Sequence, residues 1–211
     1  VSLSSFYTDS LNTRGRLGAM TAVQNCTLDL VGVRGVGAID LGVNGKFFAA
    51  NSDIQTSVTA DLIKFVNCAV PTAISSHGVS VELQKSSFQV GTPLITFLVG
   101  IGVAYFDSET ALSFAGGDIV NGEAFTRGAG PQLLRADGAL GALESVISTP
   151  GSPFHISTSA LEEDRDVIGV VYPPVASGEI ALVWQSGESI PNVGVPTSAY
   201  YRVKSTGGYT T

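Results

Sequence analysis

The sequence predicts an all-β domain of about eight strands, arranged as an antiparallel sandwich or jelly roll, with two short helices in the connections. Three observations support this fold class. Apolar and polar residues alternate with the period of two that is typical of half-buried strands. Turn-forming residues recur at short intervals, and 25 of the 211 residues are glycine. All-β domains of roughly 200–250 residues often fold as one unit, so a single domain over residues 1–211 is expected.

The two ends of the chain are polar and rich in Gly, Ser and Thr, which predicts an N-terminal arm at 1–20 and a mobile tail at 205–211. Strand alternation begins at 26–31. The glycines of 32–37 are spaced GxxGxG and not as in a dinucleotide-binding loop, so a β-bulge or strand corner is expected there. A second alternating stretch ends at Asn44-Gly45, which predicts a hairpin turn.

Two segments break the strand rhythm and predict short helices. Segment 52–66 begins with a capping box formed by Ser52 and Gln55, and its apolar residues recur at helical spacing. Segment 130–147 has Pro131 at a suitable first helical position and carries a stripe of leucines. No internal repeat is apparent in the sequence.

The remaining strands are predicted from alternation and β-branched runs at 79–84, 168–172 and 180–185. The longest apolar run, 94–106, is shorter than the roughly 18 residues of a membrane-spanning helix, so it predicts a buried strand and no membrane association. Trp184 continues the apolar face of its strand, and we expect it to pack in the core.

Charge is sparse, because Asp, Glu, Lys and Arg make up 14% of the chain and sum to a net charge of −7. A typical soluble domain carries about 25% charged residues. Surfaces poor in charge are typical of subunit interfaces, so the sequence favours assembly with many copies of itself. The bases are scattered, which excludes strong RNA binding through a basic arm and leaves Arg14 and Arg16 as the candidate RNA contacts.

The residues able to do chemistry do not form a catalytic motif. Ser75 and Ser76 precede His77, and Ser152 lies near His155, but there is no G-x-S-x-G elbow and the chain has only two histidines. We therefore expect neither an enzyme nor a cofactor, and each histidine is interpreted as an ordinary polar residue.

No metal site is expected either. Cys26 and Cys68 lack CxxC spacing, cannot form a zinc site with two histidines, and are predicted to be free thiols. Asp164 and Asp166 are the candidate calcium ligands. A solvated loop is the favoured interpretation, because Arg165 partly neutralises this acidic stretch.

Three segments in succession carry a resemblance to a known family. Segment 56–83 reads as a helix followed by a strand, and segment 93–130 as an apolar strand, a polar loop, Gly116-Gly117, a short strand and a Gly-rich turn. Segment 164–185 reads as two strands joined by a Pro/Ala/Ser turn. This order resembles tymovirus-like coat proteins. The resemblance implies an antiparallel eight-stranded jelly-roll sandwich that serves as the subunit of a small icosahedral positive-strand RNA virus, in a family without a long basic arm.

Two main function classes follow. The first is a viral coat protein, found in virions assembled in the host cytoplasm, which forms a closed shell and holds genomic RNA weakly with the help of polyamines or divalent cations. The second is a secreted or cell-surface carbohydrate-binding or adhesion module, whose sugar-stacking candidates are Trp184, Tyr200, Tyr201 and Tyr209. An accessory protein of a phage or archaeal virion is a third alternative.

Overall fold

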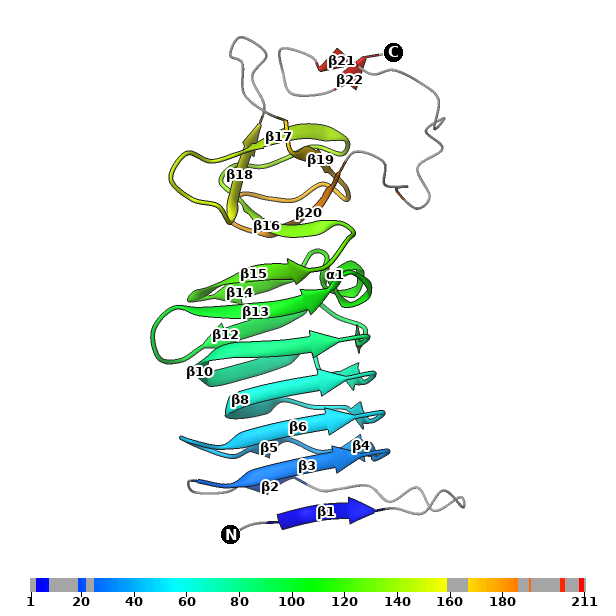
Figure 1. Ribbon diagram of the computed structural model, residues 1–211, viewed down its shortest axis with the longest axis vertical. Coiled ribbons are helices and arrows are strands. Elements are labelled where there is room, and N and C mark those ends of the chain that lie inside the picture. The colour runs from blue at the N-terminus through cyan, green and yellow to red at the C-terminus, as the bar shows by residue number, and fades with distance from the viewer. Residues whose placement is uncertain are drawn as a thin grey trace.

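The computed structural model describes residues 3–7, 19–21, 25–158, 167–185, 190, 202–203 and 209–210. A stack of mostly parallel strands extends to Arg127, and a small closed barrel follows it (Figure 1). Beyond the barrel, β21 (Arg202–Val203) pairs with β22 (Tyr209–Thr210). Among the described residues, no helix has the length and apolarity needed to cross a membrane.

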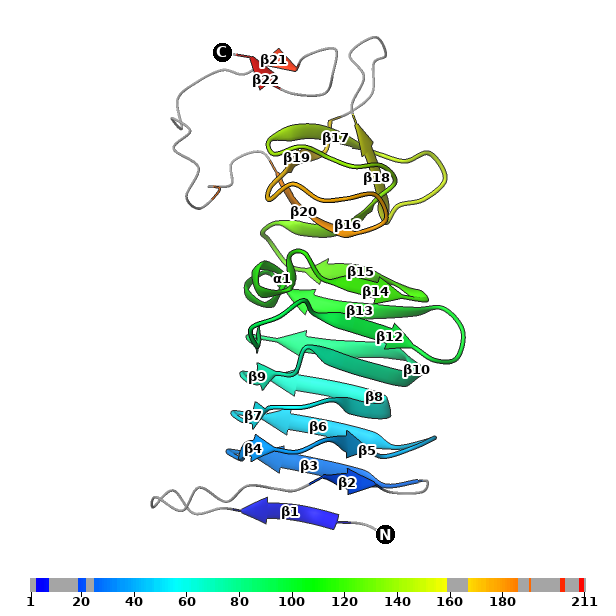
Figure 2. The ribbon, with the colours of Figure 1, turned by 180° about the vertical axis from the view of Figure 1, so that it is seen from behind.

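The stack is a parallel β-solenoid, in which the chain passes repeatedly over three faces (Figure 2). The first face carries β1 (Leu3–Tyr7), β3 (Thr27–Val31), β6 (Lys46–Ala50), the later parts of β8 (Val58–Val66) and β10 (Ala73–Gln84), β13 (Gly102–Asp107) and β15 (Gly122–Arg127). The second carries β4 (Arg34–Val36), β7 (Asp53–Ile54), β9 (Ala69–Val70) and β11 (Ser87–Phe88). The third carries β2 (Met20–Thr21), β5 (Ile39–Asp40), the early parts of β8 and β10, β12 (Leu94–Phe97) and β14 (Asp118–Val120).

In-register pairing on the first face aligns apolar side chains into columns inside the solenoid. Because successive residues of a strand point to opposite sides, one set of alternate residues faces inward. The first column consists of Leu28, Phe47, Ile63, Val81, Ala104 and Ala124, all buried. A parallel column contains Leu30, Ala49, Phe65, Leu83 and Phe106. The rings of Phe47 and Phe65 pack between neighbouring coils with centroids 5.5 Å apart.

The corner between the first and second faces is held by polar side chains. Asn51 and Asn67 adopt left-handed backbone conformations there, and the Asn67 side-chain amide donates to the side-chain oxygen Oδ1 of Asn51 at 2.6 Å. At the next position, the buried Ser52 hydroxyl accepts from the Val33 backbone N–H at 3.1 Å. Ser86 does the same for Cys68 at 3.2 Å. Buried backbone donors at the turns are thereby satisfied from one coil to the next.

The corner between the third and first faces requires close backbone approach. A Cβ atom on Gly78 would lie 2.2 Å from the backbone oxygen of Asp61 on the preceding coil. The Ser76 hydroxyl donates to that same oxygen at 3.1 Å. Glycine is therefore needed at position 78, because there is no space for a side chain.

The single helix of the described residues, α1 (Ser108–Phe114), occupies the corner after β13. Asp107 caps it by accepting from the Thr110 backbone N–H at 2.9 Å. Phe114 is buried against Phe88 and Phe106, with ring centroids 5.3 and 4.8 Å away. The helix thus covers the interior of the last coils with its apolar side.

The closed barrel consists of β16 (Gln132–Ala136), β17 (Glu144–Ser148), β18 (His155–Thr158), β19 (Gly169–Val171) and β20 (Ile180–Trp184). Strand β20 is buried on both sides. Ala181 and Val183 belong to the barrel's own core, whereas Ile180, Leu182 and Trp184 join the core of the solenoid. The barrel therefore covers one end of the solenoid with a shared apolar interface.

The structure confirms part of the sequence-based expectations. The chain is mostly β, Trp184 packs in the core, and both cysteines are free and buried. Segment 32–37 is a strand corner with a register shift between Arg34 and Val36, as expected. Within the expected N-terminal arm at 1–20, residues 3–7 and Met20 lie in strands that pair with the solenoid.

Other expectations were wrong. The described strands do not form an antiparallel eight-stranded jelly roll, because the sheets are mostly parallel. Segment 52–66 is strand and corner, and segment 130–147 contains β16 and β17, so neither is a helix. Asn44-Gly45 leads into a parallel strand and not a hairpin. The coils are also an internal repeat, which the sequence conceals because their lengths vary.

Replacing Gly78 by alanine tests the close approach of neighbouring coils. Gly78→Ala places a methyl group against the Asp61 backbone, and we expect it to lower the free energy of unfolding by about 1–3 kcal/mol. Urea denaturation followed by circular dichroism measures the change. Gly138→Ala is the matched control, since a Cβ there meets no atom within 4 Å. Equal stability of the two variants would contradict the packing described.

Candidate functional site

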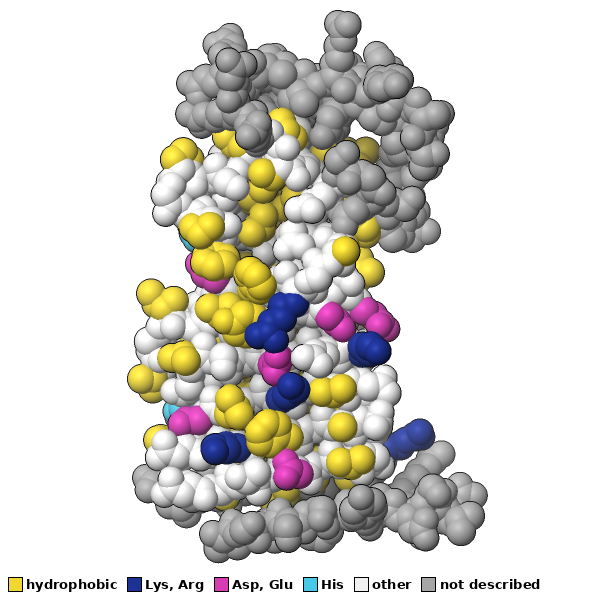
Figure 3. Space-filling model, viewed as in Figure 1, with side chains coloured by type: hydrophobic (Ala, Val, Ile, Leu, Met, Phe, Trp, Pro, Cys, Tyr) yellow, Lys and Arg dark blue, Asp and Glu magenta, His cyan; other side chains and the backbone are white. Residues whose placement is uncertain are grey.

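The outward side chains of the first face combine aromatic, acidic and basic groups. Register aligns Phe48, Lys64, Glu82, Tyr105 and Phe125 in one outward column, each on a successive strand. Neighbouring strands lie about 4.7–4.9 Å apart, so these side chains are in reach of one another. Figure 3 shows basic and acidic side chains alternating down this face, flanked by apolar ones.

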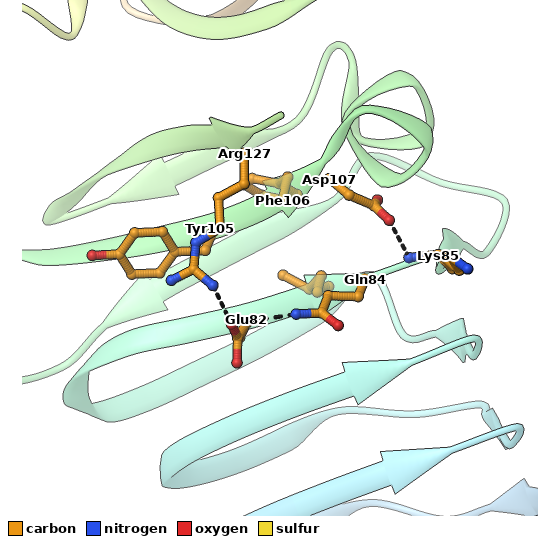
Figure 4. Close-up of a pocket in the computed structure, with 8 residues that line it drawn as sticks. Glu82, Gln84, Lys85, Tyr105, Phe106, Asp107 and Arg127 are labelled. Carbon is orange, nitrogen blue, oxygen red and sulfur yellow. Dashed lines mark hydrogen bonds and ion pairs between the residues drawn. The ribbon is translucent and has the colours of Figure 1, made fainter. Parts of the chain in front are cut away.

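Two adjoining depressions on this face share Glu82, Tyr105 and Arg127. We call them together the solenoid groove. Its outward lining residues are Phe48, Leu62, Lys64, Ser80, Glu82, Gln84, Lys85, Tyr105, Asp107 and Arg127. Figure 4 shows one of the two depressions in close-up.

Glu82 lies at the centre of the groove between two cations. Its Oε2 is 2.9 Å from Lys64 Nζ, and its Oε1 pairs with Arg127 Nη1. The Gln84 amide also donates to Oε1 at 3.4 Å. The hydrogen bond from Lys64 is the main cause that lowers the pKa of Glu82, and Arg127 lowers it further. Glu82 is therefore held as a carboxylate.

Aromatic rings lie directly beside this ionic cluster. The guanidinium carbon of Arg127 is 4.2 Å from the centroid of the Tyr105 ring, close enough for a cation–π contact. Tyr105 meets Phe125 edge to face, with centroids 5.8 Å apart, and Phe125 is 43% exposed. The Tyr105 hydroxyl points away from Glu82 and Arg127 in Figure 4. The groove, together with the Phe125 ring beside it, thus joins fixed charges to accessible ring surface.

The carboxylate of Asp107, which also lines the groove, is hydrogen-bonded to backbone N–H groups. It accepts from the N–H of Lys85 at 2.7 Å and from that of Thr110 at 2.9 Å. Burial raises the pKa of Asp107, but the hydrogen bonds from Thr110 and Lys85 outweigh this effect and leave the pKa below its usual value. Neither Asp107 nor Glu82 is suited to act as a proton donor near neutral pH. The arrangement suits binding.

A second polar group, the junction cluster of Glu123, Arg135, Asp137 and His155, joins the solenoid to the barrel. His155 Nδ1 lies 2.7 Å from Asp137 and Nε2 lies 3.1 Å from Glu123. Arg135 approaches the same Glu123 at 3.4 Å.

Arg135 and His155 are both held by this arrangement. The guanidinium of Arg135 donates to the backbone oxygens of Ile119 and Gly122 in the solenoid at 2.7 and 2.9 Å, and to that of Gly178 in the barrel at 2.6 Å. Since both ring nitrogens of His155 are engaged by carboxylates, neither is available as a general base.

The acidic neighbours of His155 favour its charged form. The hydrogen bond to Asp137 is the main cause that raises the pKa of His155, while burial lowers it and Glu123 raises it again. Hydrogen bonds from Thr149 and then from His155 lower the pKa of Asp137. The two partners are therefore both charged around pH 5 to 6.

Several candidate residues from the sequence lie outside the part of the chain that the structure describes. Arg14, Arg16, Asp164, Asp166, Tyr200 and Tyr201 are among them, and Tyr209 lies in strand β22. Trp184 is buried, and its indole N–H donates to the Tyr172 carbonyl at 2.9 Å, so it offers no surface for sugar stacking.

Two of the serine and histidine candidates have structural roles. Ser76 binds the backbone of Asp61, and His155 belongs to the junction cluster. No group of three or more His, Cys, Asp or Glu residues in the described part of the chain could hold a metal ion. Sequence reasoning missed Tyr105, Phe125 and Arg127, whose alignment depends on the register between coils.

Comparisons with family models, with curated proteins and with solved structures found no match for this chain.

The junction cluster predicts a pH dependence of stability. The raised pKa of His155 means that its contribution is complete below its ordinary pKa of 6.5 and is lost as pH rises through the raised value. The lowered pKa of Asp137 means that its contribution is complete above 3.8 and is lost as pH falls through the lowered value. We therefore expect the melting temperature to be highest near pH 4 to 6.5 and to fall by a few degrees toward pH 9.

Thermal unfolding followed by circular dichroism across this pH range measures the effect. His155→Gln should flatten the decline above pH 6.5, because it removes the titrating partner of Asp137 and Glu123. His77→Gln in β10 serves as the control and should leave the decline in place. A profile identical in His155→Gln and in the original protein would refute the role of the cluster.

Proposed function

We propose that this chain is a carbohydrate-binding or adhesion module that holds a glycan chain in the solenoid groove. The observation that carries the proposal is the groove itself, where aromatic rings stand beside charged and amide groups that are already held in place. Sugar rings have apolar faces that stack on aromatic side chains, and hydroxyl groups that hydrogen-bond to carboxylates, amides and guanidinium groups.

The dimensions of the first face suit an extended polymer. From Phe48 to Phe125 the outward column crosses five strands, a length of about 19 Å at the usual strand spacing. One strand spacing is comparable to the length of one sugar unit in an extended chain. A glycan lying along the solenoid axis would therefore meet a new set of side chains at each successive coil.

The state of the carboxylates supports binding over hydrolysis. Glycoside hydrolysis uses a pair of carboxyl groups, one of which must donate a proton. Glu82 is ion-paired with Lys64 and Arg127, and Asp107 caps α1, so both are held ionised. The proposal therefore includes binding without catalysis, which the sequence also predicts.

The coat-protein hypothesis stays a prediction, but the structure removes one argument for it. That hypothesis included an antiparallel jelly roll, whereas the described strands form a parallel solenoid and a small barrel. The exposed aromatic groove is a specific feature that favours the carbohydrate-binding alternative.

Loss of the exposed ring tests the proposed function. We expect the full chain to bind at least one of a panel of immobilised neutral and acidic polysaccharides, and Phe125→Ala to weaken that binding by about tenfold, the effect typical of a stacking residue. Leu112→Ala is the matched control, because Leu112 is 44% exposed but lies on α1. Binding to no polysaccharide, or equal binding by both variants, would exclude this function.

A further inference from the structure

We infer that the solenoid groove selects glycans that carry carboxylate groups, which dock on Arg127 and Lys64. This inference rests on the proposed function and adds the class of ligand. It depends on the charge balance at the centre of the groove, on the unused hydrogen-bonding capacity of Arg127 and on the exposure of Arg127 and Lys64.

The centre of the groove carries more positive than negative charge. Glu82 is shared by Lys64 and Arg127, so one carboxylate balances two cations. Asp107, the other acid lining the groove, accepts hydrogen bonds from two backbone N–H groups, that of Lys85 and that of Thr110 in the first turn of α1. The excess positive charge occurs in a chain whose net charge is −7, and it is therefore a local property of this face.

Arg127 is positioned to bind a second carboxylate. A guanidinium group has five N–H donors in a planar fork. In the described part of the chain Arg127 donates only to Glu82, through Nη1, so most of its donors remain unused. The Tyr105 ring supports the guanidinium plane from one side at 4.2 Å, which fixes the fork before a ligand arrives.

Both cations are accessible to a ligand. The side chains of Arg127 and Lys64 are 50% and 37% exposed, while Glu82 between them is 25% exposed. A sugar stacked on Phe48 or Phe125 would place its substituents near a cation, because Phe48 pairs with Lys64 in the outward column and Arg127 follows Phe125 by two residues on the same side of β15. A carboxylate on the sugar would then form charge-assisted hydrogen bonds, which are stronger than those of a hydroxyl.

Single-stranded RNA is the competing polyanion, since it also combines phosphates with bases that stack on aromatic rings. Such binding needs a basic track that follows the backbone over several nucleotides. Along this face the cations are interrupted by Asp29, Glu82 and Asp107. A glycan with carboxylates on individual sugars fits this spacing better than a continuous chain of phosphates.

The test compares two forms of one polysaccharide, with its carboxylates free or esterified. Isothermal titration of the full chain with alginate, a polymer of uronic acids, and with its propylene glycol ester should show alginate binding about tenfold more tightly. Arg127→Gln and Lys64→Gln should each remove most of that preference, while melting temperatures confirm that the variants fold. Arg34→Gln on the second face is the matched control and should retain it. Added salt should weaken the binding of alginate more than that of the ester.

The outcomes separate this inference from the proposed function. Equal binding of alginate and its ester would overturn the charge selectivity and leave the glycan-binding role standing. Binding of a neutral polysaccharide but not of alginate would do the same. Binding to neither class of polysaccharide would overturn both. Tighter binding of polyuridylate than of alginate, abolished by Arg127→Gln, would assign the groove to nucleic acid and overturn both as well.

Discussion

The in-register stacking of coils is the constraint on which the rest of this structure depends. Each first-face strand hydrogen-bonds to the strand of the next coil, and the same register places Leu28, Phe47, Ile63 and Val81 above one another inside the solenoid. A slip of one residue would turn this buried column to solvent, because strand side chains alternate between faces. Register therefore determines both the core and the outer surface.

The corners make this stacking possible, and each does so through different chemistry. At one corner, side chains such as Ser52 and Ser86 satisfy backbone N–H groups that the turn would leave without a partner. At another, Gly78 allows the chain to pass against the Asp61 backbone. The glycine at one corner and the serines at the other thus serve the packing of neighbouring coils.

The sequence predicts the strands of this protein far better than their arrangement. Alternation correctly placed strands near 26–31, 79–84 and 180–185, since it reports which side chains face the core. It carries no information on whether the neighbouring strand is parallel. Unequal coil lengths hid the repeat, as the separations from Phe47 to Ile63 and from Val81 to Ala104 show. The groove could not be predicted for the same reason, because its residues meet only through register.

Strand β15 belongs both to the proposed binding surface and to the interface with the barrel that caps the solenoid. Its outward residues are Glu123, Phe125 and Arg127. Glu123 belongs to the junction cluster, Phe125 contacts Tyr105, and Arg127 pairs with Glu82. The end of a stack of parallel strands exposes unpaired backbone and apolar side chains, and a cap is needed to cover them. Here the barrel supplies the cap through Ile180, Leu182 and Trp184. The groove consequently reaches the capped end, where β15 is held by the barrel from one side and by β13 from the other, and Arg127 is presented from a strand with little freedom to move.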